Sequence, residues 1–160
     1  LMWNGSHGCF DSIWSLNMIE YLPGKFINYL ALGNHFSLGK LTVFADFMNR
    51  SLVDKMSFLR DFTLIGKVAY SFNDKLNVFG KASFDHNDLD REGDWCVMPG
   101  TSMGRVGCGV EYFPLADKSI RLHATFCHSF GDNGNPAGVL LDNQQIASVG
   151  LTWRMSLLKR

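Results

Sequence analysis

Basic side chains on alternating positions are the residues of this sequence with the clearest chemical role. Cations along a water-filled passage create a positive potential that favours anions. The spacing predicts that these side chains, with one histidine and one acid, line such a passage: Lys67, Lys81, Arg105, Arg121, Arg154, His123 and Glu111. In the alternative, Glu111 and nearby aspartates pair with the cations and leave a balanced lining. The sequence leaves both open.

Catalytic and metal-binding patterns are weak. The sequence has no Gly-rich phosphate loop, nucleophile elbow or HExxH site. Asp85, His86 and Asp88 near Ser83 could suggest a hydrolase, but such groups at loop tips are more often simply solvated. His123 and His128 fall on opposite faces of one predicted strand and cannot share a metal ion. We therefore expect no enzyme activity, cofactor or metal.

The four cysteines show neither a CxxC motif nor metal-ligand spacing. Cys108 and Cys127 should lie on opposite faces of neighbouring strands and should not pair. Cys9 and Cys96 fall in predicted loops on the same side, so a disulfide between them stays open.

The stretch 61–85 gives the strongest structural signal. It reads as two strands joined by a turn at 73–75, and period two persists through both of them. Strands of soluble proteins usually run about 5–6 residues, whereas a tilted strand of about 10 residues crosses a bilayer. The stretch therefore predicts a transmembrane β-hairpin.

Composition limits the alternatives. The 160 residues suit a single β-barrel domain, or the C-terminal segment of a larger barrel. Hydrophobic residues make up 46% of the chain, but no apolar run reaches the ~18 residues of a spanning helix. The 15 basic and 15 acidic residues balance, which argues against a general nucleic-acid binder.

The order of expected elements follows from the same alternation. Residues 1–11 read as a loop, 12–22 as a strand or a short helix with the strand favoured, and 24–39 as a connector with room for one short strand. Six clear strands follow, at 40–48, 61–72, 75–85, 103–113, 119–129 and 145–156. The connections around them are long at 49–60, 86–101 and 131–143 and short at 73–75 and 114–118. Short periplasmic turns alternating with long extracellular loops are typical of an antiparallel transmembrane β-barrel. We expect that all-β fold.

Charge and aromatic residues sort along these strands. The apolar faces of the six clear strands carry no Lys, Arg, Asp or Glu, although a soluble sheet with one wet face would show the same pattern. The aromatic positions favour lipid, because they flank a middle of small or aliphatic residues. The turn end has Tyr70, Phe72, Tyr112 and Trp153, and the loop end has Phe47, Phe84 and Phe126. This pattern predicts a membrane aromatic girdle.

Several segments carry a family resemblance. They are Leu32–Leu41, Asp46–Arg50, Arg60–Thr63, Glu111–Pro114 and Val149–Arg154. Through them, most of residues 10–160 resembles the C-terminal part of a Bacteroidetes outer-membrane porin of the phosphate-selective porin O and P family. The resemblance implies a barrel of usually about sixteen strands, often trimeric, in which an arginine ladder and loop lysines select phosphate.

The expected function is an outer-membrane porin for passive diffusion of small hydrophilic solutes, with anions such as phosphate among them. Its partners would be the lipid bilayer, those solutes and two further copies in a homotrimer, without nucleic acid. One alternative is a small plugged eight-stranded outer-membrane barrel with a structural or adhesive role. The other is a soluble lipocalin-like barrel, whose apolar face would turn inward around a ligand.

Overall fold

The computed structural model describes residues 1–52, 59–88, 100–133 and 143–154. These residues form one antiparallel sheet of nine strands in sequential order, and no helix occurs among them. The strands are β1 (Met2–His7), β2 (Phe10–Leu22), β3 (Lys25–Leu38), β4 (Leu41–Leu52), β5 (Asp61–Asn73), β6 (Leu76–Asn87), β7 (Thr101–Tyr112), β8 (Ile120–Asn133) and β9 (Gln145–Trp153). The predicted all-β meander is confirmed.

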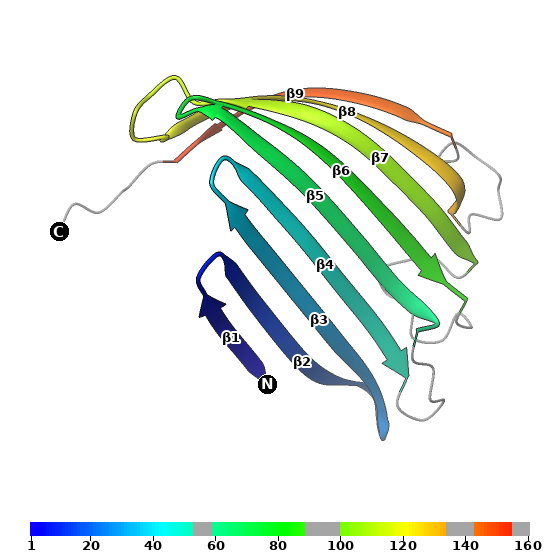
Figure 1. The fold of residues 1–160 in the computed structure, drawn as a ribbon. Helices are drawn as coiled ribbons and strands as arrows, with labels where there is room; N and C mark the ends of the chain where they lie inside the picture. The colour runs from blue at the N-terminus through cyan, green and yellow to red at the C-terminus, as the bar shows by residue number, and fades with distance from the viewer. Residues whose placement is uncertain (53–58, 89–99, 134–142, 155–160) are drawn as a thin grey trace.

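The sheet curves into an open arch whose edges are β1 and β9 (Figure 1). Each inner strand pairs with both of its sequence neighbours, while β1 pairs with β2 alone and β9 with β8 alone. The described strands therefore close neither the barrel that the sequence predicts nor an eight-stranded one. What they form is a continuous curved segment of sheet.

The predicted hairpin 61–85 is present as β5 and β6. Gly66 lies opposite Ala82, and the pairing continues to both ends of the two strands. At the turn, the Asn73 side-chain oxygen accepts hydrogen bonds from the backbone N–H groups of Lys75 at 2.8 Å and Leu76 at 3.0 Å. Such an Asx-type turn fixes the register of the flanking strands. The sequence identified this hairpin correctly.

The first forty residues differ from their sequence-based prediction. Met2–His7 forms strand β1 instead of a loop, and 24–39 contains the 14-residue strand β3 instead of a connector. The helical alternative for 12–22 is wrong, because this stretch is strand β2, which pairs with β3 along its length and with β1 up to Ser15. Apolar residues on both faces of β3, such as Ile27 and Leu30 to Leu32, hide the period-two signal.

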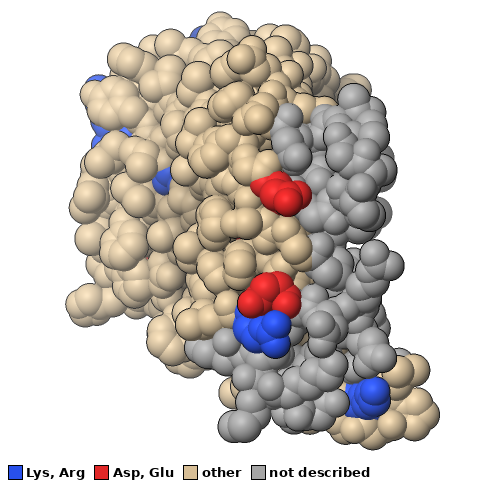
Figure 2. Space-filling view, turned by 90° about the vertical axis from the view of Figure 1, so that its right-hand side faces the viewer, with Lys and Arg blue, Asp and Glu red and all other residues tan. Residues whose placement is uncertain are grey.

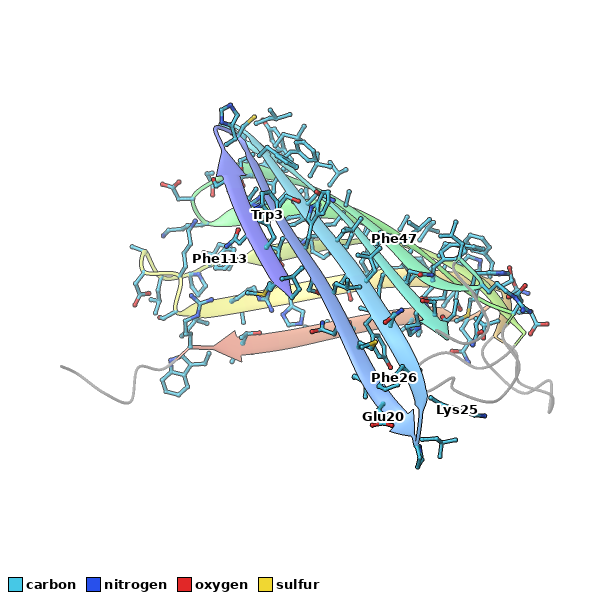
Figure 3. All side chains as sticks on the ribbon, turned by 90° about the horizontal axis from the view of Figure 1, so that it is seen from below. Trp3, Glu20, Lys25, Phe26, Phe47 and Phe113 are labelled. Atoms are coloured by element: carbon cyan, nitrogen blue, oxygen red, sulfur yellow. The ribbon has the colours of Figure 1, made fainter. Side chains whose placement is uncertain are left out.

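The added strands also change which end of the sheet each connection occupies. The turn at 23–24 is short but lies at the loop end, where Glu20 Oε1 accepts a hydrogen bond from Gly24 N at 2.7 Å (Figure 3). Cys9 lies in the turn between β1 and β2, at the opposite end of the sheet from Asn87 and Thr101, between which Cys96 lies. The prediction that Cys9 lies at the loop end is therefore wrong. Cys96 itself is outside the described residues.

The sheet is a single layer without a hydrophobic core. Only Ile27 and Met103 are buried hydrophobic residues in the described part of the chain. Large apolar side chains are instead exposed along the strands, for example Val68 at 48%, Val106 at 47% and Val149 at 88%. From the loop end, the described surface shows only scattered charged side chains (Figure 2). Hydrophobic burial within this sheet therefore contributes little to its stability.

Candidate functional site: the charged face of the sheet

Strand alternation divides the side chains between two faces. The interstrand register places six of the seven residues predicted to line a passage on the same face of the sheet, which we call the charged face. They are Lys67, Lys81, Arg105, Glu111, Arg121 and His123. Arg154 follows directly after β9 and is exposed. The other face, which we call the apolar face, contains charges only near strand ends among the described residues: Glu20 in β2 and Asp132 in β8.

Glu111 is the centre of the first ion-pair group. Its Oε1 atom lies 3.3 Å from Arg121 Nη1 and 3.9 Å from Lys67 Nζ, so one carboxylate serves two cations. Arg121 also donates to Thr152 Oγ1 at 3.2 Å, and Lys67 Nζ lies 4.4 Å from the centre of the Phe79 ring. The group therefore ties β5, β7, β8 and β9 together and keeps net positive charge.

Two further ion pairs lie closer to the loop end. Arg105 Nη1 donates to Asp85 Oδ2 at 2.5 Å, and Thr63 Oγ1 donates to the other oxygen of this carboxylate at 2.8 Å. Arg50 and Asp61 form a second pair that is almost completely buried. In these pairs the cation is neutralised by a neighbouring acid. Much of the charged face is thus balanced in charge, as the alternative interpretation expects.

Lys81 and Asp46 remain without an ion pair among the described residues. Lys81 lies directly opposite Lys67 and is exposed. Asp46 lies opposite Gly33 on one side and Ile65 on the other and is also exposed. The charged face therefore has unpaired positive charge on the β5–β8 side and unpaired negative charge on the β2–β4 side.

Glycine–ring pairs are a feature that the sequence analysis missed. Phe79 lies opposite Gly109, Phe130 opposite Gly104 and His123 opposite Gly150, and a Cβ atom added to any of these glycines would collide with the facing ring. Rings that cover cross-strand glycines shield the exposed backbone of the pair. His123 therefore packs against Gly150 of β9, and its Nδ1 atom is buried without a hydrogen-bond partner among the described residues. Only the pairing register could have revealed these partners.

All seven predicted girdle residues lie on the apolar face. Phe47 is half-buried, and the other six are exposed by 36–62%: Tyr70, Phe72, Tyr112, Trp153, Phe84 and Phe126. Tyr70 and Phe72 pack edge to face, with ring centres 5.1 Å apart. The register aligns Phe126 with Val68, Gly80 and Cys108 in the middle of the face, so the prediction that Phe126 lies at the loop end is wrong. Phe130 instead lies in the same cross-strand row as Phe84. Phe130 is a loop-end aromatic residue outside the predicted girdle.

The arrangement offers no assembled catalytic or metal site within the described residues. No group of three His, Cys, Asp or Glu side chains converges there. Ser83 and Asp85 lie on the charged face, while His86 lies on the apolar face, where its ring stacks near Phe84 at 6.4 Å. Asp88 pairs with Arg60 at 2.8 Å.

As predicted, Cys108 and Cys127 lie on opposite faces of the sheet. Cys108 pairs with Phe126 on the apolar face, and Cys127 pairs with Gly107 on the charged face.

One acidic group has a perturbed acidity. In the turn between β7 and β8, the Asp117 carboxylate accepts hydrogen bonds from the backbone N–H of Ser119 and from the Ser119 hydroxyl. These bonds, the backbone one having the larger effect, hold the pKa of Asp117 below its ordinary value.

In the described residues, no helix is long and apolar enough to span a membrane. Comparison with protein-family models, curated proteins and solved structures finds no match to this chain.

Proposed function

We propose that this chain forms part of the wall of a bacterial outer-membrane β-barrel porin, through which small hydrophilic solutes diffuse passively. The observation that carries the proposal is the single-layer sheet with opposite faces. One face exposes large apolar side chains such as Val68 and Val106, and the other contains an ion-paired polar network around Glu111 and Asp85. Both faces have a suitable solvent if lipid covers the apolar face and water covers the charged face.

Strand length supports the same proposal. The strands from β2 to β8 contain 12–14 residues, which exceeds the ~9–11 residues that cross a tilted bilayer path. The exposed aromatic residues of the apolar face add the amphipathic side chains that favour the headgroup region. A soluble ligand-binding barrel would need to enclose the apolar face, whereas Val68, Val106 and Leu122 are 40–48% exposed here.

The open edges add a requirement for the complete barrel. In lipid, the unpaired backbone groups of β1 and β9 must find partners, so further strands pair with both edges in our proposal. Because β1 and β9 are both odd-numbered strands of one meander, they run in the same direction. An odd number of additional strands is therefore needed to close an entirely antiparallel barrel. A sixteen-stranded barrel, which the porin resemblance implies, meets this condition, and we propose that three such barrels form a trimer.

The residual charges suggest a modest preference for anions such as phosphate. Lys81 has no ion pair among the described residues, and Lys67 and Arg121 share the single carboxylate of Glu111. Along a channel these groups would raise the local anion concentration. The proposed transport needs no catalytic residue or cofactor.

Single-channel conductance in planar bilayers tests the proposal. The purified protein, with native trimers as a parallel sample, should give ohmic current steps in a salt gradient. Membranes with detergent alone serve as the control. Reproducible insertion without current would exclude a water-filled channel and would favour a barrel filled by side chains.

A further inference from the structure

A hollow of about 680 Å³ opens on the charged face between β2 and β6. Its lining combines small, aliphatic and polar side chains, among them Ile13, Ser15, Ala31, Asp46, Met48 and Thr63. The volume lies within the ~300–1,000 Å³ typical of small-molecule sites. The hollow is also separate from the cationic groups of Lys67, Lys81 and Arg121, none of which lines it.

The pairing register explains its shape. Gly33 lies between Ile13 and Asp46, and Asp46 in turn lies opposite Ile65, which forms one row across the sheet. Gly33 has no side chain, and Ser15 and Ala31 in the next row have small ones. Little side-chain volume therefore covers the backbone at the bottom of the hollow. Ile13 is 51% exposed, Met48 40% and Ile65 45%. Exposed hydrocarbon therefore lies beside Asp46 on the charged face.

Asp46 is the only lining charge without a partner in the part of the chain that the structure describes. The other ionised groups at the hollow are neutralised, because Arg50 pairs with Asp61 and Asp85 pairs with Arg105. The Asp46 carboxylate is exposed and close to the Gly33 backbone, where a Cβ atom would lie 3.5 Å from its Oδ1. A single available negative charge thus stands beside apolar walls.

We propose that this hollow binds organic cations in which a primary ammonium group is attached to a short aliphatic chain. Asp46 accepts a charge-assisted hydrogen bond from the ammonium group, and the hydroxyl oxygens of Ser15 and Thr63 provide further acceptors at its edge. The hydrocarbon chain covers Ile13, Met48 and Ile65 and removes apolar surface from water. Inorganic anions are repelled by Asp46 and do not use this site.

The proposal goes beyond the porin function and does not depend on a conducting channel. It needs only the paired strands β2 to β6 and access of water to the charged face. If the protein does conduct, organic cations would pass close to Asp46 and anions close to Lys81, so the two kinds of solute would follow different sides of the charged face. Failure of conductance would leave the binding measurement unaffected.

Methyl NMR provides the test. The protein is labelled with ¹³C at isoleucine and methionine methyl groups in zwitterionic micelles and titrated with n-butylammonium. Saturable shifts are expected at Ile13, Met48 and Ile65, while Ile120 and Ile146 on β8 and β9 stay unchanged. 1-Butanol, which has the same chain without the charge, corrects for partitioning into micelles and should bind at least about tenfold more weakly, the equivalent of ~1.4 kcal/mol.

Matched variants locate the charge that matters. Asp46→Asn should weaken n-butylammonium binding by about tenfold or more, because it removes the charge without changing the side-chain size. Asp11→Asn is the control, because Asp11 lies on the same face of β2 but outside the hollow, 3.6 Å from His35. Equal affinity in the wild-type protein and Asp46→Asn would overturn the proposal, as would equal binding of 1-butanol. Unchanged methyl spectra of the free variants establish that the sheet is intact.

Discussion

Lys67 and Lys81 face each other across β5 and β6, yet within the described part of the chain only Lys67 has a carboxylate within ion-pair distance, Glu111 at 3.9 Å. Two like charges directly opposite each other in a sheet are destabilising. The structure relieves this repulsion by drawing Lys67 over the Phe79 ring and toward β7. Lys81 is left as the cation with the greatest access to mobile anions on this part of the face.

The first prediction concerns this lysine. Lys81→Glu should shift the reversal potential in a salt gradient toward cation selectivity, because it replaces an unpaired positive charge and gives Lys67 a new partner. Arg60→Glu is the control, because Arg60 already pairs with Asp88 at the loop end. An unchanged reversal potential in Lys81→Glu would remove this residue from the conducting path.

The second prediction concerns the two paired arginines. Arg105→Glu combined with Arg121→Glu should also shift the reversal potential toward cations, since Asp85 would lose its arginine partner and Glu111 would keep only Lys67. Unlike Lys81→Glu, this double variant should also lower the urea midpoint of unfolding. Both acids are largely buried, with side chains only 11% and 14% exposed, and an unpaired buried charge is costly. Unaltered selectivity would contradict the placement of both arginines along a channel.

A third prediction separates lipid from water as the solvent of the apolar face. Leu64 and Ile65 are adjacent residues of β5, each 45% exposed, on the apolar and the charged face respectively. Leu64→Arg should destabilise the bilayer-inserted protein by up to about 2–4 kcal/mol, whereas Ile65→Arg should be tolerated on the wet face. Urea unfolding from lipid vesicles measures both variants. In a soluble sheet, the two equally exposed sites would give similar small effects.

The glycine–ring pairs give a fourth prediction. Gly109→Ala should destabilise the protein by about 1–3 kcal/mol, because the new methyl group collides with the Phe79 ring and lies 2.8 Å from the backbone oxygen of Ala124. Gly66→Ala is the matched control within a strand, since a Cβ atom there meets nothing within 4 Å. Equal unfolding midpoints for the two variants would show that the facing ring moves aside at little cost.

The fifth prediction concerns pH. Because the folded-state pKa of Asp117 is lowered, its ionised form contributes stability above its unfolded-state pKa, and this contribution is lost as pH falls through the folded-state pKa. Ser119→Ala removes the hydroxyl but keeps the backbone N–H, which is the larger cause, so the pKa should rise only partway toward its ordinary value. A ¹³C-carboxyl NMR titration would measure this. No rise at all would assign the whole effect to the backbone.

The sequence predicted the structure best where alternation was unbroken. In β5 and β6, apolar and polar side chains alternate along whole strands, so period two alone located the hairpin and assigned Lys67 and Lys81 to one face. In β3, apolar residues occupy both faces and conceal the alternation. The sequence consequently predicted a connector with at most a short strand in place of the 14-residue β3, and the error moved Cys9 to the wrong end of the predicted sheet.

By itself, the sequence determined the all-β class and which side chains share a face along each clear strand, because side-chain direction in a strand is a local property of the backbone. Which charges meet became apparent from the assembled sheet alone. The sharing of Glu111 by Lys67 and Arg121, the unpaired Asp46 beside Gly33, and the cover of Gly150 by His123 all depend on interstrand register. Register is set by turns, bulges and the number of strands, and a shift of one residue would exchange every partner.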